Sequence, residues 1–260
     1  MFAACGVITL TTDFGPQGPF VATMKGRILA RLPEARIIDV THDVPVYWPA
    51  EAGFWLVRSF GYFPAGTVHV AVVDPGVGTS RRGIVITTPN GLLVGPDNGL
   101  LVWAAEALGG IESAHEIRGN GAVSSTFHGR DVFAPAAARL ALGGKPSEAG
   151  PEIDKDSLVR LPDPAVTVGD GWLEAEVLTV DRFGNVQLAA TGEMLRGLGN
   201  ELVINGTVSA HLGRTFADVS QGDLLVFEDS AGHVAIAVNN GRAVVVLSVR
   251  PGDVVKVASR

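Results

Sequence analysis

The sequence is poor in cysteine and in positive charge. A single cysteine, Cys5, excludes an internal disulfide and a zinc site built from cysteines. Twenty-seven acidic residues stand against 20 basic ones, giving a formal net charge of -7, and the longest basic run is Arg81–Arg82. Nucleic-acid-binding proteins usually carry a basic patch or stripe, so a nucleic-acid partner is disfavoured.

Long apolar runs are also missing. No stretch approaches the ~18 apolar residues of a transmembrane helix. The first ten residues lack the basic and apolar regions of a secretory signal peptide. We therefore expect a cytoplasmic protein without a membrane partner. Its 47% hydrophobic residues are enough to build the core of one large or two smaller domains.

Glycine, in contrast, is abundant, at 33 of 260 residues, where an average protein has about 7%. These glycines follow no fixed period, which excludes collagen-like and repeat architectures. Many stand beside Asp, Asn and Arg. This pattern indicates tight loops in which the backbone approaches a ligand closely.

Residues 1–160 alternate strand-like and helix-like segments. The strands are expected at 7–12, 36–40, 68–73, 84–88 and 92–94, and the helices at 20–32, 50–60, 98–108 and 131–142. This alternation predicts an α/β domain, a mainly parallel sheet with helices on both faces. The polar loops at the carboxyl ends of such strands are where these sheets bind ligands.

Residues 161–260 are dominated by short strands. Four prolines between 143 and 168 indicate a linker, which places the domain boundary near residue 160. Strands are expected at 173–180, 201–204, 224–227, 234–238, 243–249 and 254–257. Short strands at close spacing predict a small barrel or sandwich.

Several loops carry candidate functional residues, each with a structural alternative. Asp13 either caps a turn or binds two vicinal hydroxyls, and the lack of a second aspartate beside it disfavours calcium. Asp74 and Arg81 are seven residues apart, on a glycine-rich loop that lacks both the full dinucleotide fingerprint and a P-loop, and could form an ordinary ion pair. His128 stands at the start of a predicted helix. There it either caps the helix or, with its pKa lowered by the helix dipole, acts as a neutral base. His42 could be another base or part of a turn.

Other loops are equally open to two readings. Asp181 and Asn185 suit either a polar ligand or a turn, and 229–232 and 239–242 suggest hairpin turns. Neither a nucleophilic serine elbow nor a base next to Cys5 is found. Spacing alone therefore predicts a small polar ligand held in glycine-rich loops.

Six motifs together resemble one family. They are Thr11-Thr-Asp-Phe-Gly15, Thr41-His-Asp43, Asp74-Pro-Gly-Val-Gly-Thr-Ser-Arg81, Gly95-Pro-Asp-Asn-Gly99, Phe127-His-Gly-Arg-Asp131 and Asp181-Arg-Phe-Gly-Asn185. In this order, over nearly the whole chain, they resemble the S-adenosylmethionine (SAM) hydrolases, or SAM hydroxide adenosyltransferases. These enzymes are related to fluorinases and chlorinases.

The resemblance implies an N-terminal α/β domain, a C-terminal β-barrel and a homotrimer that binds SAM between neighbouring subunits. It assigns Asp13 to the ribose diol, and Trp48 to the ribose and methionine side. Asp74, Arg81 and His128 match the set that activates water, although the sequence leaves open which of Arg81 and Arg82 enters the site. The implied products are adenosine and methionine, with no metal or other cofactor.

The resemblance also assigns residues of the second domain. Asp181 and Asn185, with Ser230 close by, match positions that bind the amino-acid group of methionine. Phe216 matches an aromatic residue that stacks on adenine. Val238 and Asn240 fall where backbone groups contact the adenine edge.

Departures from the related halogenases favour water as the nucleophile. By the resemblance, halogenases carry tyrosine at the position of Asp74 and another residue at that of His128, and the fluorinase has serine in place of Gly129. The fluorinase also has a long insertion where residues 83–95 form a short hairpin here. A halogenase, a SAM- or adenosine-binding protein without turnover and a metal-dependent nucleoside hydrolase are the alternatives.

Overall fold

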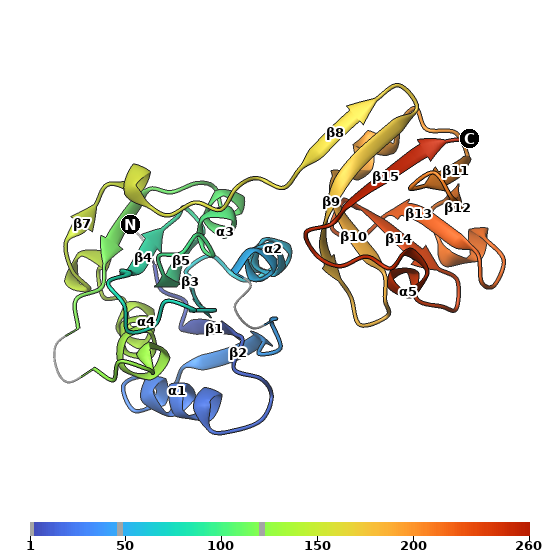
Figure 1. Ribbon diagram of the computed structural model, residues 1–260. Coiled ribbons are helices and arrows are strands. Elements are labelled where there is room, and N and C mark those ends of the chain that lie inside the picture. The colour runs from blue at the N-terminus through green and yellow to red at the C-terminus, as the bar shows by residue number, and fades with distance from the viewer. Residues whose placement is uncertain (1–2, 46–48, 120–122) are drawn as a thin grey trace. The chain divides into compact units, whose positions relative to one another are not determined.

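The computed structural model describes residues 3–45, 49–119 and 123–260, so Trp48 lies outside the described residues. The chain divides into two units, Met1–Leu161 and Pro162–Arg260, each with its own core (Figure 1). We call them the N-terminal unit and the C-terminal unit. Among the described residues, no helix is long and apolar enough to cross a membrane.

The described part of the N-terminal unit is built on a seven-stranded sheet of order β2-β1-β3-β5-β4-β6-β7. Its strands are β1 (Val7–Thr12), β2 (Arg36–Thr41), β3 (Thr67–Val72), β4 (Gly83–Thr87), β5 (Gly91–Pro96), β6 (Ser113–Glu116) and β7 (Glu152–Ile153). The pairs of β1 with β2, β1 with β3 and β3 with β5 are parallel. The β4–β5 hairpin and strands β6 and β7 add an antiparallel edge.

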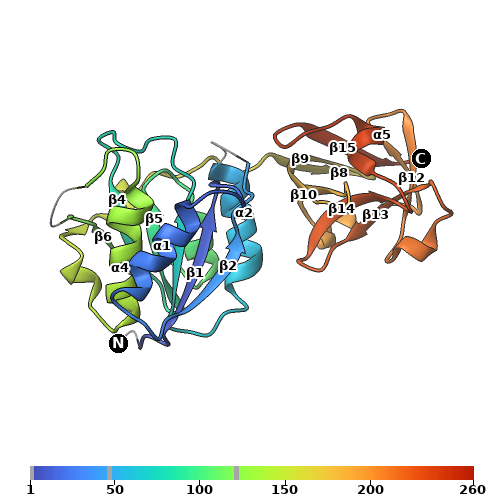
Figure 2. The same cartoon turned by 90° about the horizontal axis from the view of Figure 1, so that it is seen from below.

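Helices cover both faces of this sheet, which confirms the predicted α/β class (Figure 2). They are α1 (Phe20–Leu29), α2 (Pro49–Phe60), α3 (Val102–Ala107) and α4 (Ala134–Ala141). Side chains alternate along a strand, so β3 sends Val68 and Val70 into the core under α1 and α4, and Ala71 into the core under α2 and α3. Asp13 and Asp74 therefore follow strands that are packed against helices on both faces of the sheet.

The C-terminal unit forms the predicted β-barrel. Its strands are β8 (Val166–Gly169), β9 (Trp172–Val180), β10 (Val186–Thr191), β11 (Glu201–Ile204), β12 (Val208–Leu212), β13 (Leu224–Glu228), β14 (His233–Val238) and β15 (Val254–Ser259). The order β10-β14-β13-β12-β11-β15-β9 is closed by pairing of β9 with β10, and β8 is added outside on β9. Seven strands thus close the barrel.

The strand predicted at 243–249 is wrong. This segment forms the short helix α5 (Ala243–Leu247), which Ser248 ends in a left-handed conformation. The valine-rich run favours a strand, but the seven-stranded barrel closes through the β9–β10 pairing without it. Ala243 instead packs in the core, and Val245 is 67% exposed.

Candidate functional site

Two predicted carboxylates leave neighbouring parallel strands. Thr12 and Val72 are paired at the ends of β1 and β3, so Asp13 and Asp74 emerge at the same edge of the sheet. A cavity of about 60 Å³ opens there, which is enough room for at least one water molecule. Its lining residues are Asp13, Phe14, Val72, Asp74, Val77, Thr126, Phe127, His128 and Gly129.

Arg81 connects Asp74 with His128. Its Nε donates to Asp74 Oδ1 (2.8 Å), and its Nη2 contacts the second carboxylate oxygen. The same Nη2 donates to His128 Nδ1 (2.7 Å). The Asp74 and Arg81 side chains are largely buried, and the guanidinium lies over the Phe133 ring. The structure thus brings the predicted Asp-Arg-His set together as one hydrogen-bonded group.

This contact assigns the tautomer of His128. A guanidinium has donors only, so Nδ1 must accept, and the single proton of the neutral ring is on Nε2. Burial lowers the pKa of His128, and the charge of Arg81 lowers it further, against the opposing effects of Asp74 and Asp131. The imidazole is therefore neutral near pH 7 and offers an N–H donor at Nε2.

Close packing between two loops aligns Arg81 with His128. Gly78 has φ +80°, and a Cβ at this residue would lie 2.3 Å from the carbonyl oxygen of Ser125. Only glycine tolerates both the left-handed conformation and this approach. The 74–81 loop is thereby seated against the segment that leads to His128.

Asp131, the last residue of the Phe127–Asp131 motif, fixes that segment from its other end. Its carboxylate accepts from the Ser124 amide (3.0 Å) and from two nitrogens of Arg130 (2.7 Å each). The Arg130 hydrogen bonds are the main reason that the pKa of Asp131 falls to about 2. The motif begins α4 through a π-helical turn, Gly129–Phe133. Sequence reasoning gave Asp131 no role.

Arg82 points away from this group. Its guanidinium donates to the buried Asp97 (2.9 and 2.5 Å) and to the Ser157 carbonyl (2.6 Å). Asp97 also accepts from the Val159 amide (2.9 Å). The structure thus answers the question left open by the sequence: Arg81 contacts His128, and Arg82 anchors the start of the linker.

A larger cavity, about 480 Å³, lies in the C-terminal unit and is lined by Phe183, Asn185, Phe216, Val238, Asn240, Gly241 and Arg242. It gathers four residues predicted from the resemblance. Its volume is typical of a small-molecule site. Phe216 is 45% exposed, with its edge against Phe227 (5.6 Å between centroids). Phe183 and Arg242 were missed, because nothing in their local sequence sets them apart from turn residues.

Two other predicted residues have different surroundings. The Asp181 carboxylate accepts from the Phe183 and Asn185 amides (2.9 Å each) and from Asn185 Nδ2 (2.7 Å), which is the predicted turn. Ser230 lies in the turn before β14, and its role at the amino-acid group stays a prediction. Asn185 precedes the end of β10 that pairs with Ile236, whereas Ser230 precedes the opposite end of β14.

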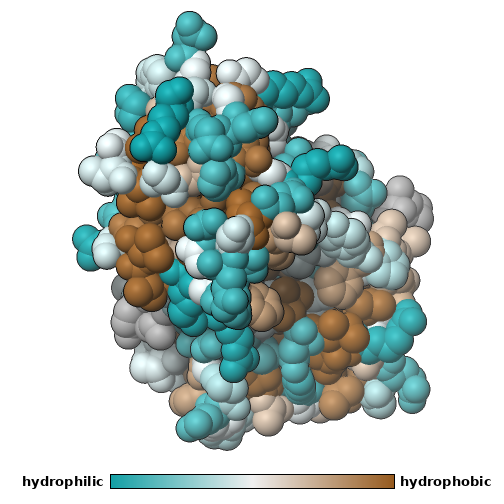
Figure 3. Space-filling view, turned by 90° about the vertical axis from the view of Figure 1, so that its right-hand side faces the viewer, coloured by the Kyte–Doolittle hydropathy of each residue, from teal (hydrophilic) through white to brown (hydrophobic). Residues whose placement is uncertain are grey.

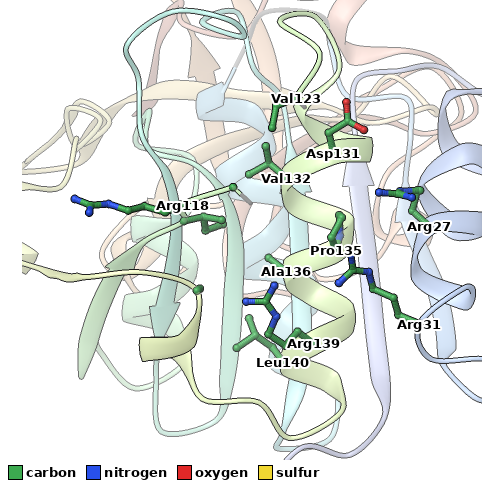
Figure 4. Close-up of a pocket in the computed structure, with 13 residues that line it drawn as sticks. Arg27, Arg31, Arg118, Val123, Asp131, Val132, Pro135, Ala136, Arg139 and Leu140 are labelled. Carbon is green, nitrogen blue, oxygen red and sulfur yellow. The ribbon is translucent and has the colours of Figure 1, made fainter. Parts of the chain in front are cut away.

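An arginine-lined cavity of about 140 Å³ lies beside α4 (Figure 4). Arg27 and Arg139 occupy the last turns of α1 and α4, where a cation complements the helix dipole. The Arg118 side chain extends away from α4 in this view. The positions of Arg27 and Arg139 at the ends of α1 and α4 therefore account for the presence of their charges beside this cavity. Among the described residues, no three His, Cys, Asp or Glu side chains form a metal-binding group.

Polar groups at the carboxyl ends of the parallel strands of a mixed sheet, followed by a barrel with an open pocket, are typical of a two-domain protein that binds a small molecule. Family models for the N- and C-terminal domains of SAM hydroxide adenosyltransferase match residues 8–150 and 175–256. The chain belongs to the SAM hydroxide adenosyltransferase family, as the six motifs predicted.

Individual relatives agree with this assignment. The chain is 54% identical to the (R)-S-adenosyl-L-methionine hydrolase of Salinispora arenicola, over 97% of both chains. It is only 28% identical to a fluorinase of Actinoplanes sp., over 90% of this chain and 91% of the other. An uncharacterized conserved protein from Thermotoga maritima has a similar crystal structure (TM-score 0.90, 36% identity), covering 96% of this chain and 99% of that one.

Proposed function

We propose that the protein hydrolyses SAM to adenosine and L-methionine. The observation that carries the proposal is the group formed by Asp74, Arg81 and His128 beside a water-sized cavity shared with Asp13. Water attacks the ribose 5′-carbon: a C–O bond forms as the C–S bond breaks. The sulfur keeps the bonding electron pair, so methionine leaves as a neutral thioether, and the proton lost by the water passes to solvent. The leaving group therefore needs no general acid.

The catalytic demand falls on the nucleophile, which must be desolvated and in line with the departing sulfur. The fixed charge of Arg81 stabilises developing hydroxide, and Asp74 holds the guanidinium in place. His128 accepts from Arg81 at Nδ1 and thus presents Nε2–H to the cavity. Of the two roles open to it, taking a proton or positioning the water, this tautomer favours positioning.

Substrate binding draws on both units. Asp13 holds the ribose diol, and Trp48 lines the ribose and methionine side. In the barrel, Asp181 and Asn185 bind the amino-acid group of methionine. Phe216 stacks on adenine, and the backbone at 238 and 240 contacts the edge of the adenine ring. Ser230 is kept as a further residue for the amino-acid group.

A homotrimer, with the N-terminal unit of one copy facing the barrel of the next, is part of the proposal. Apolar groups at the surface support it: Phe183 is 76% exposed at the barrel cavity, and apolar side chains reach the face drawn in Figure 3. Light scattering on purified protein tests the trimer. We also place the enzyme in the cytoplasm.

The test is to incubate the protein with SAM, with and without chloride and EDTA, and to identify the products by mass spectrometry. Adenosine and methionine in every arm support hydrolysis without a metal. A 5′-chloro product would indicate a halogenase, which the short β4–β5 hairpin already disfavours. Bound but unchanged SAM would indicate a binding protein.

A further inference from the structure

His42 lies directly behind the turn that carries Asp13. Strand β2, which ends at Thr41, pairs with β1, which ends at Thr12. The His42 Nδ1 lies 2.9 Å from the hydroxyl of Thr12, whose side chain is fully buried. On its other side, His42 Nε2 lies 3.1 Å from Asp39, which pairs with Lys25 (2.5 Å).

The direction of these hydrogen bonds follows from their partners. The carboxylate of Asp39 accepts only, so His42 carries its proton on Nε2 and accepts at Nδ1. The Thr12 hydroxyl then donates to His42, and its oxygen accepts from the Phe14 amide (3.2 Å). Hydrogen bonds therefore run from His42 through the Thr12 hydroxyl to the backbone just after Asp13, with the Asp39 carboxylate as a charged neighbour behind the ring.

The backbone of His42 adds a second attachment. Its carbonyl accepts from the amide of Gly15 (2.8 Å), which has φ +75° and open space around it. Asp13 thus lies between Thr12 and Gly15, both held by His42.

We infer that His42 is a positioning residue for Asp13: it fixes the turn that aims the carboxylate into the cavity. The inference rests on the proposed function, in which Asp13 binds the ribose diol. His42 is not a second base, because both ring nitrogens face protein groups and the ring does not line the cavity. Loss of the ring weakens ribose binding and leaves the group of Asp74, Arg81 and His128 intact.

The experiment compares wild type with His42→Ala, His42→Asn and Thr12→Val. We expect His42→Ala and Thr12→Val to raise KM for SAM and Kd for adenosine about 5- to 30-fold, the factor for roughly 1–2 kcal/mol of lost hydrogen bonding. The kcat and its pH profile stay unchanged. His42→Asn, whose amide oxygen accepts from Thr12, restores most of the affinity. His211→Ala, on β12 of the barrel, is the matched control and leaves both constants unchanged.

Hydrogen exchange at the Phe14 and Gly15 amides tests the turn without any ligand. We expect it to accelerate in His42→Ala and Thr12→Val but not in His211→Ala. If His42→Ala does not fold, Thr12→Val and His42→Asn decide the question by the same criteria. Unchanged exchange together with KM and Kd within twofold of wild type, or a fall in kcat alone, would overturn the inference. A wild type that folds but neither binds adenosine nor hydrolyses SAM refutes the proposed function instead, and the exchange result still stands.

Discussion

Replacing Arg81 by glutamine tests the arrangement at the cavity. The substitution removes two hydrogen bonds to Asp74, one to His128 and the fixed charge that stabilises hydroxide. Loss of one preorganised transition-state donor typically costs ~10²–10³ in kcat, or about 3–4 kcal/mol. We expect Arg81→Gln to lie in this range. Adenosine affinity stays within a few-fold of wild type, because in the proposed mechanism Arg81 acts on the attacking water and not on the nucleoside.

The same variant changes the pH dependence in a defined direction. Neutral His128 is the active form, so wild-type activity is lost as the pH falls through a pKa below 6.5. The charge of Arg81 lowers this pKa and that of Asp74 raises it. Without Arg81 the pKa rises, and the acid limb of kcat/KM moves to higher pH.

The neighbouring arginine supplies the control. Arg82→Gln leaves the buried Asp97 with fewer partners, so it lowers the free energy of unfolding by ~1–3 kcal/mol. Its kcat in the folded state stays near wild type. Steady-state kinetics from pH 5 to 9 and urea unfolding measure both variants. Equal loss of kcat in the two, or an acid limb that moves downward in Arg81→Gln, would refute the reasoning.

Three further predictions concern the scaffold. Asp131→Asn moves the acid limb of kcat/KM to lower pH, opposite to Arg81→Gln, because the charge of Asp131 raises the pKa of His128; an upward shift would contradict this. Gly78→Ala lowers the free energy of unfolding by ~1–3 kcal/mol and reduces kcat, since a Cβ would meet Ser125; wild-type values in both assays would show that the loop adapts. Burial lowers the pKa of His69 to about 3, so between pH 6.5 and 3 the unfolded state binds a proton that the folded state does not. The free energy of unfolding is therefore highest above pH 6.5 and falls as the pH decreases toward 3. From pH 7 to 4, wild type should therefore lose about 3 kcal/mol more unfolding free energy than His69→Leu in urea titrations, and equal losses would contradict the assignment.

The amino-acid pattern of a segment predicted its secondary structure where the surroundings of that segment in the fold suit its composition. The β-branched run of β1 and the apolar run of β3 form strands because both faces of the sheet are covered. The equally β-branched segment 243–249 forms a helix instead, since the barrel closes through the β9–β10 pairing without it. Strand β12, Val208–Leu212, was not predicted although its apolar and polar residues alternate, because it is only five residues long and contains alanine and serine, which are weak strand formers.

In the candidate site, too, contacts between residues close in the sequence could be predicted, and contacts between distant residues could not. The pairing of Asp74 with Arg81 is local and could be read from a spacing of seven residues. The contact of His42 with Thr12 joins residues 30 apart and depends on the order of strands in the sheet. Sequence reasoning therefore named His42 but could not distinguish a base from a turn residue.

Isotope incorporation during a single turnover tests the central claim most directly. Excess protein is mixed with SAM in ¹⁸O-water, with Arg81→Gln in a parallel reaction, and the adenosine formed is analysed by mass spectrometry. Attack of water at the 5′-carbon predicts one ¹⁸O atom at the 5′-hydroxyl of wild-type product, and little product from Arg81→Gln. Unlabelled adenosine, a 5′-halo product or unchanged SAM from wild type would contradict it.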